Sequence, residues 1–239
     1  MISNKSPIDF HLQIDTFKFY VPRNFFAPNE LEHIWSEVFV QPEQNPHSYV
    51  SDFVKMQAND VVIDAGACEG FFIHFSLENK CSKVIALEPE PNLAKCLEKT
   101  FDSDSRVEVH NLALSDNVGT AKMVLGNEYG CTAKLSGEGN MNVKTTTLDQ
   151  LSSKLKLEKI DWIKMDIEDK EVEALKGAIQ TINRYRPKLS IAVYHSYENA
   201  RAIKELIHSN IADYQVSFGG CFLYEEPARP FMLYAKSVL

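Results

Sequence analysis

The feature that most constrains the fold is a short apolar run that ends in a tight glycine turn. Residues Val61 to Gly70 read Val-Val-Ile-Asp-Ala-Gly-Ala-Cys-Glu-Gly, and an apolar helical segment follows directly. The next apolar run begins at Lys83 and closes with Glu88, 18 residues after Gly70. In a strand-helix-strand unit, an acid about 20 residues after such a turn reaches the hydroxyls of a ribose. The pattern therefore predicts a nucleotide-type pocket.

The glycine positions indicate which nucleotide is bound. A dinucleotide fingerprint needs a second glycine two positions after the first, because the backbone there approaches the pyrophosphate. Cys68 stands at that position, and Phe71 stands where the third glycine would fall. The remaining pattern, Asp64-x-Gly66-x-x-x-Gly70 with the later acid, suits an adenosine ligand without phosphates. S-adenosylmethionine is the commonest cofactor of that kind, and we predict it here.

Composition excludes several classes of protein. A chain of 239 residues fits one α/β unit with a substantial core. A formal net charge of -8 argues against nucleic acid as the partner, because that binding depends on clustered Lys and Arg. The five cysteines are odd in number and lack paired metal spacing, so we expect reduced thiols. No apolar run is long enough for a signal-peptide core or a membrane span, which predicts a cytoplasmic protein without a membrane partner. No sequence pattern specifies an oligomeric state.

Two parts are expected along the chain. Residues 1–58 have the pattern of an N-terminal helical extension or lid, with a helix that starts at Asn29 and ends before Pro42. Residues 59–239 alternate strands and helices and form the main domain. The expected strands are Val61–Asp64, Val84–Glu88, Val107–Leu112, Ile160–Met165, Lys188–Tyr194, Tyr214–Phe218 and Phe231–Ala235, and the expected helices are Phe71–Glu78, Asn92–Thr100, Val172–Ile182 and Tyr197–Ser209.

This order of elements predicts an α/β fold with a seven-stranded, mostly parallel sheet and helices on both faces. One strand is antiparallel, because the last two strands are joined by a short connection and parallel neighbours need a long crossover. Two further strands, Thr120–Leu125 and Asn142–Thr147, are expected around a mobile Gly-rich loop, Gly126–Gly139, that is placed to cover a substrate. The whole arrangement is the Rossmann-like plan of class I methyltransferases.

Four blocks of sequence resemble the FkbM type of S-adenosylmethionine-dependent methyltransferase, and together they cover most of the chain from Val61 onward. The blocks are Asp64-Ala-Gly-Ala-Cys-Glu-Gly70; Glu88-Pro89 with Pro91; Asn111-Leu-Ala-Leu-Ser-Asp116 with Gly119; and Thr146-Thr-Leu-Asp149 followed by Ile163-Lys-Met-Asp-Ile-Glu168, Glu171 and Leu175-Lys-Gly177-Ala. Tyr194-His195 is also similar to a Tyr-His pair in part of that family. Two positions depart from the family pattern, since Cys68 replaces an Asn and Asp169 replaces a glycine. The resemblance implies O-methylation of a small-molecule, sugar or glycan hydroxyl.

Specific side chains are candidates for holding the cofactor. They are Asp64, Gly66, Cys68, Gly70, Glu88, Asn111 and Asp166. Asp64 is placed to orient the turn amides and the ammonium group of the methionine moiety, or else simply caps the turn. Glu88 is expected to accept both ribose hydroxyls. Asn111 either bonds the adenine amino edge or is an ordinary turn residue.

The candidate catalytic residues are Asp166, Glu168 and His195, which follow neighbouring strands at the carboxyl edge of the sheet. Methyl transfer to a hydroxyl requires a positioned acceptor and removal of a proton. Asp166 is expected to line the methionine and acceptor site, and Glu168 or His195 is the candidate base. Alternatively, the carboxylates only complement a helix dipole and His195 caps a helix. A divalent metal held by these three residues is a further alternative, but no ligand spacing supports it, so we assign none.

Three functions remain open at this point. The first is an S-adenosylmethionine-dependent methyltransferase that acts on a small-molecule or carbohydrate acceptor. The second is a non-catalytic or regulatory module that binds the same cofactor. The third, a nucleotide-dependent oxidoreductase, is disfavoured by Cys68 in the fingerprint.

Overall fold

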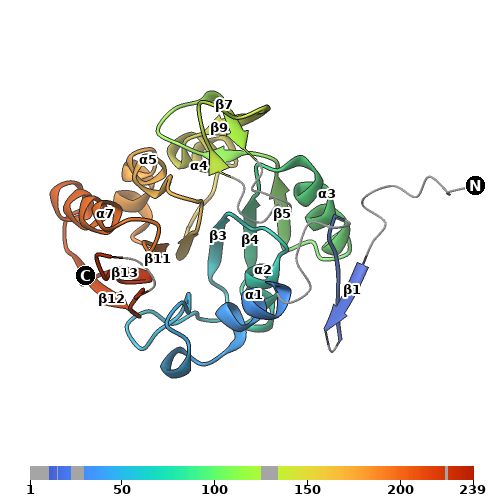
Figure 1. Cartoon of the computed structure of the whole chain (residues 1–239), viewed down its shortest axis with the longest axis horizontal. Helices are drawn as coiled ribbons and strands as arrows, with labels where there is room; N and C mark the ends of the chain where they lie inside the picture. The colour runs from blue at the N-terminus through green and yellow to red at the C-terminus, as the bar shows by residue number, and fades with distance from the viewer. Residues whose placement is uncertain (1–10, 15, 23–29, 125–133, 224–225) are drawn as a thin grey trace, which may run out of the picture.

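The centre of the protein is a seven-stranded sheet with the strand order β12-β13-β11-β10-β3-β4-β5. The computed structural model describes residues 11–14, 16–22, 30–124, 134–223 and 226–239 (Figure 1). The strands of this sheet are β3 Val61–Ala65, β4 Lys83–Leu87, β5 Val107–His110, β10 Trp162–Met165, β11 Lys188–Ala192, β12 Tyr214–Gly219 and β13 Met232–Ser237. Only β13 runs antiparallel to its neighbours, β11 and β12. The predicted fold class is therefore confirmed.

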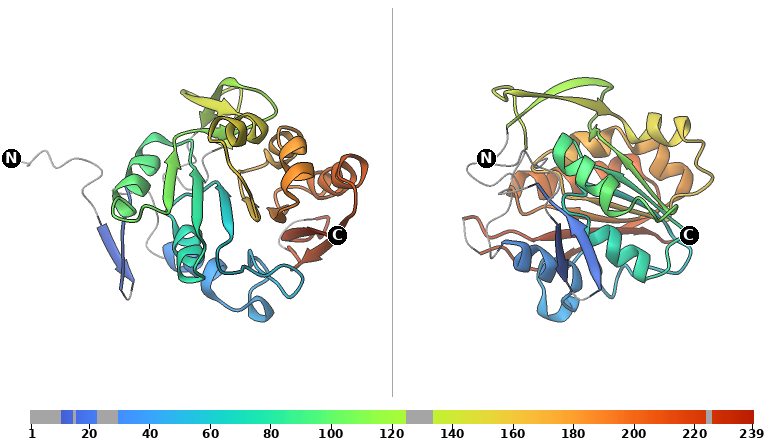
Figure 2. Two further views of the ribbon diagram at one scale, coloured as in Figure 1. Left: turned by 180° about the vertical axis from the view of Figure 1, so that it is seen from behind. Right: turned by 90° about the vertical axis from the view of Figure 1, so that its right-hand side faces the viewer.

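Helices cover both faces of this sheet (Figure 2). They are α1 Glu30–Phe39, α2 Phe71–Glu78, α3 Pro91–Thr100, α4 Leu148–Lys154, α5 Glu171–Lys176, α6 Ile179–Tyr185 and α7 Tyr197–Asn210, with a short 3-10 turn, η1 Pro42–Gln44. Alternate residues of one strand enter different cores: Ile63 packs with the helices that follow β9, whereas Val62 packs with α2 and α3. A strand buried on both faces reads as a continuous apolar run, which is the pattern at Val61.

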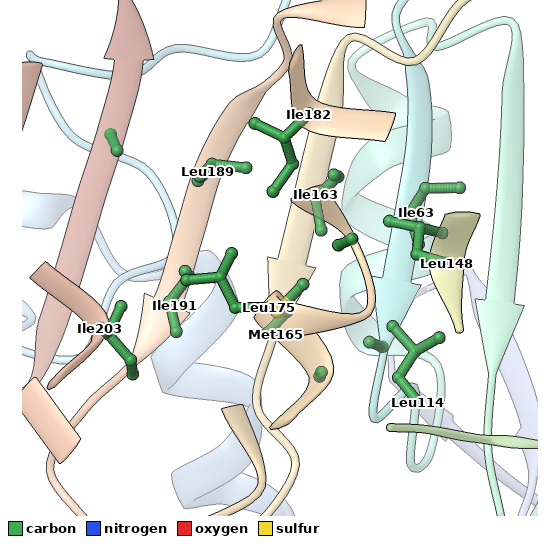
Figure 3. Packing of buried hydrophobic residues seen from close by; sticks show 14 of the residues in the cluster. Ile63, Leu114, Leu148, Ile163, Met165, Leu175, Ile182, Leu189, Ile191 and Ile203 are labelled. Carbon is green, nitrogen blue, oxygen red and sulfur yellow. The ribbon is translucent and has the colours of Figure 1, made fainter. Parts of the chain in front are cut away.

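The core on the first face is built from branched aliphatic side chains. Figure 3 shows Ile63, Ile163, Leu189 and Ile191 of the sheet packed beside side chains of the covering helices, such as Leu175. All of these side chains are buried. Burial of each such side chain stabilises the fold by about 1.5–3 kcal/mol relative to its exposure.

The N-terminal residues pack on the second face. The ring of Trp35 in α1 lies 5.0 Å from the ring of Phe71 in α2. A hairpin of β1 His11–Ile14 and β2 Phe17–Tyr20 adds Phe19, whose ring also lies 5.0 Å from Phe71. The backbone amide of Tyr20 donates to Thr100 Oγ1 of α3 at 2.9 Å. The described part of residues 1–58 thus shares an aromatic core with the main sheet.

A second, four-stranded sheet stands between β5 and α4. Its strands are β6 Ala113–Leu114, β7 Gly119–Val124, β8 Lys134–Leu135 and β9 Met141–Thr146, in the order β6-β9-β7-β8. The two extra strands expected here correspond to β7 and β9. The loop Gly126–Gly139 was predicted to be mobile. More than half of it falls within residues 125–133, which lie outside the described residues, so its mobility stays a prediction.

One helix prediction is wrong. The apolar pattern from Val172 to Ile182 predicted a continuous helix, but the structure has two helices, α5 and α6, separated at Gly177. A Cβ atom at Gly177 would lie 2.2 Å from the carbonyl oxygen of Ser115. The helix is interrupted where the chain passes this carbonyl group, which is distant in the sequence. The periodicity along the helix does not reveal such a contact.

Within the described ranges, every helix falls short of the length and apolar character that crossing a bilayer requires.

Candidate functional site

A cavity of about 760 Å³ opens at the carboxyl ends of β3, β4 and β10. This volume lies within the range of small-molecule sites, and the position is where ligands bind in open α/β sheets. Its wall is formed by residues from the N-terminal segment, from the glycine turn after β3 and from the segment that follows β10. The lining includes Glu37, Asn45, His47, Tyr49, Gly66, Ala67, Cys68, Glu69, Phe72, Glu88, Leu93, Leu114, Met123, Lys164, Asp166, Glu168, Lys170, Tyr194, Phe222 and Phe231.

The turn after β3 has the left-handed backbone that its glycines allow. Gly66 has φ +80°, and a Cβ atom there would lie 1.9 Å from the carbonyl oxygen of Asp166. Gly70 has φ +92° and begins α2, and a Cβ atom there would lie 2.8 Å from Leu97 and Phe101. Cys68 also has a positive φ of 47°. The turn can therefore pack against β10 and α3 only because both glycines lack a side chain.

Glu88 lies at the end of β4 with both carboxylate oxygens directed at backbone amides. The amide of Cys68 donates to Oε2 at 3.0 Å, and the amide of Glu90 donates to Oε1 at 2.8 Å. Burial raises the pKa of Glu88 to about 7. Each carboxylate oxygen has a second lone pair, so the group can also accept hydroxyls from a ligand in the cavity.

Asp64 does not line the cavity. Its side chain is fully buried, and its Oδ1 lies 3.1 Å from Lys164 Nζ. The same ammonium group donates to the carbonyl oxygen of Gly66 at 2.7 Å. Burial disfavours the charge of Lys164, but the Asp64 and Asp166 carboxylates outweigh it and raise the pKa of the lysine. Lys164, which lines the cavity, thus stands between Asp64 and any ligand.

Asn111 is not brought to the cavity wall. Its side chain is exposed, and Nδ2 donates to the carbonyl oxygens of Glu88 and Pro89, each at 2.9 Å. This placement supports the turn interpretation of Asn111, in which the amide holds the backbone that follows β4. The proposed bond to the adenine amino edge gains no support from it.

Asp166 lies on the cavity wall, in a network that sequence reasoning missed. Tyr49 donates its hydroxyl to Asp166 Oδ2 at 2.6 Å, and His47 Nε2 lies 3.7 Å from the same oxygen. His47 Nδ1 lies 2.7 Å from Glu37 Oε1. Burial lowers the pKa of His47, but the Glu37 carboxylate outweighs it and raises the value above 6.5. Burial also raises the pKa of Asp166, yet His47 and Lys164 hold it below its usual value.

His195 and Glu168, the other candidate catalytic residues, take different positions. Glu168 lines the cavity, whereas His195 does not. His195 Nε2 lies 3.5 Å from Glu168 Oε2, and Nδ1 lies 3.7 Å from Oε1 of Glu171, which begins α5. Burial lowers the pKa of His195 and raises that of Glu171 to about 8. The structure therefore brings the predicted residues together but adds Glu171 behind them.

The fold is that of the Rossmann-like class I methyltransferases. The family model of the methyltransferase FkbM domain matches residues 64–216, and the chain belongs to that family. The family assignment confirms the predicted resemblance, and with it S-adenosylmethionine as the cofactor of the class.

Two known proteins show how far the similarity extends. The chain is 28% identical over 166 residues to a protein from Haloferax volcanii named hexuronic acid methyltransferase AglP, covering 66% of each chain. It is similar in structure to an FkbM methyltransferase from Methylobacillus flagellatus KT, with a TM-score of 0.58 and 21% identity, over 84% of this chain and 47% of that one. The chain thus spans slightly less than two thirds of the first protein and about half of the second.

Proposed function

We propose that this protein transfers a methyl group from S-adenosylmethionine to a hydroxyl oxygen of a carbohydrate. The observation that carries the proposal is the continuity of the cavity. Its wall carries the glycine turn and Glu88 together with Tyr49, His47 and Asp166. One continuous space would thus hold the nucleoside close to acids and an imidazole, which an in-line displacement requires.

The glycine turn and Glu88 fit the cofactor. The turn from Gly66 to Gly70 keeps its shape because both glycines pack closely on the protein where a Cβ atom would clash. Glu88 would hold the ribose hydroxyls, and Asp64 would act from behind by fixing Lys164 and the turn. Carboxylates outnumber ammonium groups along the wall, which favours a cationic ligand. When bound there, the cofactor supplies an electrophilic methyl group on a positively charged sulfur.

His47 and the residues around it would accept the proton from the hydroxyl group of the acceptor. His47 Nε2 is buried and has no hydrogen-bond partner among the described residues, while Glu37 holds the opposite ring nitrogen. A carboxylate in that position orients the imidazole and stabilises its charged form after it takes a proton. Because His47 lines the cavity and His195 does not, we assign the role of base to His47 in place of His195. Asp166 and Glu168 would position the acceptor.

The acceptor class rests on the relative and on charge. The similar protein from Haloferax volcanii is named for a hexuronic acid, which favours a sugar hydroxyl as the acceptor. The net charge of -8 disfavours nucleic acid or an anionic membrane surface. The proposal includes action in the cytoplasm on a small-molecule or carbohydrate acceptor.

Two measurements test the function. Calorimetry with S-adenosylhomocysteine should show binding, and nicotinamide dinucleotides should show none. Transfer of an isotope-labelled methyl group should then occur to uronic acids or related sugars, with an O-methyl signal in the product. Donor binding without transfer to any sugar, hydroxylated metabolite or amine would instead favour a non-catalytic module.

Variants of His47 and Asp166 test the roles assigned to these residues. Replacement of His47 by Gln should lower kcat by roughly 10²–10⁴-fold, which is the usual contribution of a general base. The affinity for the product S-adenosylhomocysteine should stay unchanged. Asp166→Asn should also depress turnover more than cofactor binding. Glu43→Ala is the matched control, because Glu43 is exposed in η1 and outside the cavity wall. Normal turnover in the His47 variant would exclude this residue as the base.

A further inference from the structure

Asp166, Glu171 and His195 form a compact group of metal-ligand type. One side-chain ligand atom from each residue lies within 4.8 Å of the other two. The three residues follow β10, begin α5 and follow β11, so rigid elements of the sheet edge fix their relative positions. Sequence reasoning had considered a metal with Glu168 in place of Glu171, and the structure changes that ligand set.

Three polar atoms of Glu171 and His195 lack hydrogen-bond partners in the part of the chain that the structure describes. Glu171 is fully buried; its Oε1 accepts from the amide of Ile167 at 2.9 Å, while Oε2 has no hydrogen bond. Neither ring nitrogen of His195 has a hydrogen bond. An unsatisfied buried polar atom costs about 1–3 kcal/mol, so three in one place call for a missing partner.

The spacing suits an ion between the side chains. His195 Nδ1 and Glu171 Oε1 lie 3.7 Å apart, which is too long for a hydrogen bond. Bonds of about 2.0–2.2 Å to a shared metal place two ligand atoms about 3–4.2 Å apart, depending on the angle between them. Asp166 has one oxygen held by Tyr49, which leaves its carboxylate able to ligate as well.

We propose that Asp166, Glu171 and His195 bind a divalent first-row transition-metal ion such as Mn²⁺. Carboxylate oxygens suit Mn²⁺, and an added imidazole nitrogen favours transition metals over Mg²⁺ and Ca²⁺. Glu168 lies 3.5 Å from the other ring nitrogen of His195 and would orient that ring, as carboxylates do behind many metal-bound histidines.

The use of the ion rests on the proposed function. Asp166 belongs to the wall of the cavity, so an ion on this residue would be within reach of an acceptor bound there. A metal in that position would lower the pKa of a bound hydroxyl and hold it in place, and His47 would take the proton that the hydroxyl releases.

Metal binding can be measured without donor or acceptor, which separates this proposal from the proposed function. The full chain is stripped with a chelator and titrated with Mn²⁺, with free ion followed by electron paramagnetic resonance and bound ion by mass spectrometry. We expect one ion per chain. Glu171→Gln and His195→Gln should each weaken binding by roughly tenfold or more. Glu171→Gln keeps the oxygen that accepts from Ile167, so it preserves the local backbone.

Glu173→Gln is the matched control, because Glu173 lies on the same helix but pairs with Lys170 at 3.3 Å outside the cluster. Its affinity for Mn²⁺ should equal that of the original chain. The proposal is overturned if Mn²⁺, Zn²⁺, Fe²⁺ and Ni²⁺ all fail to bind, or if Glu171→Gln binds as well as Glu173→Gln. Full methyl transfer by the metal-free chain would overturn the catalytic use of the ion, whereas binding without transfer would leave the site intact and count against the proposed function alone.

Discussion

Lys164 contacts both the glycine turn and the Tyr49 ring on the cavity wall. Its ammonium group lies 3.1 Å from Asp64 Oδ1, donates to the Gly66 carbonyl, and stands 5.0 Å from the centre of the Tyr49 ring. Both charged side chains of the pair are almost completely buried. A buried pair of this kind is sensitive to loss of one partner, because the other charge remains without compensation.

Replacement of Asp64 by Asn should therefore destabilise the fold. The free energy of unfolding should fall by up to about 3–5 kcal/mol, since the buried Lys164 charge loses the carboxylate that it contacts directly. Thermal unfolding followed by circular dichroism would show the loss as a lower Tm. The double variant Asp64→Asn with Lys164→Met also removes the buried ammonium group and should recover part of the stability. An unchanged Tm in the single variant would show that the pair does not stabilise the turn.

Glu88 predicts that cofactor affinity depends on pH. Because burial raises its pKa to about 7, the carboxylate becomes protonated as the pH falls through that value. The charged form is the better acceptor for ribose hydroxyls, so S-adenosylhomocysteine affinity should be constant above about pH 8 and decline toward pH 6. Calorimetry from pH 5.5 to 8.5 measures the profile.

Two variants assign this profile to its residue. Glu88→Gln should bind weakly with little change over the range, and Glu88→Ala should lose affinity altogether. Glu69, whose pKa burial also raises to about 7, lies in the same wall. Glu69→Gln should keep the decline that belongs to Glu88. A Glu88→Gln profile as steep as the original would refute the ribose assignment.

At the scale of elements, local periodicity predicted what depends on local sequence. The helix Phe71–Glu78 was predicted with the bounds that α2 has, because the glycine turn marks its start and apolar residues continue through it. The break between α5 and α6 was missed, since its cause is the approach of Gly177 to Ser115, 62 residues earlier in the chain.

The same distinction separates the predicted and the missed parts of the site. The turn at Gly66 and the acid Glu88 form a local motif with a recognisable spacing, and the structure places both on the cavity wall. Tyr49 contacts Asp166 across 117 positions, and His47 depends on Glu37 from α1. No short-range pattern marks such pairs. The available signal in the sequence would be polar residues of the types that are often buried, such as His and Tyr, within the predicted N-terminal extension.

Asn45 couples α1 to the segment that carries His47. Its Nδ2 donates to the carbonyl oxygens of Ser36 and Glu37 at 3.0 and 2.9 Å, and its Oδ1 accepts from the His47 amide at 2.9 Å. The side chain thereby satisfies carbonyls at the end of a helix, which otherwise lack partners.

Asn45→Ala should therefore affect both stability and turnover. Unpaired groups at the helix end should lower the free energy of unfolding by about 1–3 kcal/mol. Turnover should fall further than this loss of stability explains, because the His47 ring is no longer held, while product affinity stays unchanged. Chemical denaturation and single-turnover rates measure the two effects. Equal kcat in Asn45→Ala and in the exposed control Glu43→Ala would argue against the coupling.

At the scale of the whole molecule, residues 45–50 are fastened to the main sheet from two strands. Ser190 Oγ of β11 donates to the carbonyl oxygen of Tyr49 at 2.5 Å, and the Tyr234 hydroxyl of β13 donates to that of Ser48 at 2.5 Å. The predicted boundary at residue 58 would allow this segment to open as a lid. The two buried hydrogen bonds instead favour opening together with the sheet, because each costs free energy to break within the closed structure.

Hydrogen exchange measures which description holds. If the segment belongs to one cooperative unit, protected amides in 45–50 and in β3 should exchange with similar opening free energies. Saturation with S-adenosylhomocysteine at about 100 times its Kd should slow both by roughly a hundredfold, equal to about 2.7 kcal/mol. A segment that exchanges much faster than β3 would instead mark an independent lid. The double variant Ser190→Ala with Tyr234→Phe should create that behaviour by releasing residues 45–50 while β3 keeps its protection, because the sheet's own backbone hydrogen bonds do not pass through either hydroxyl.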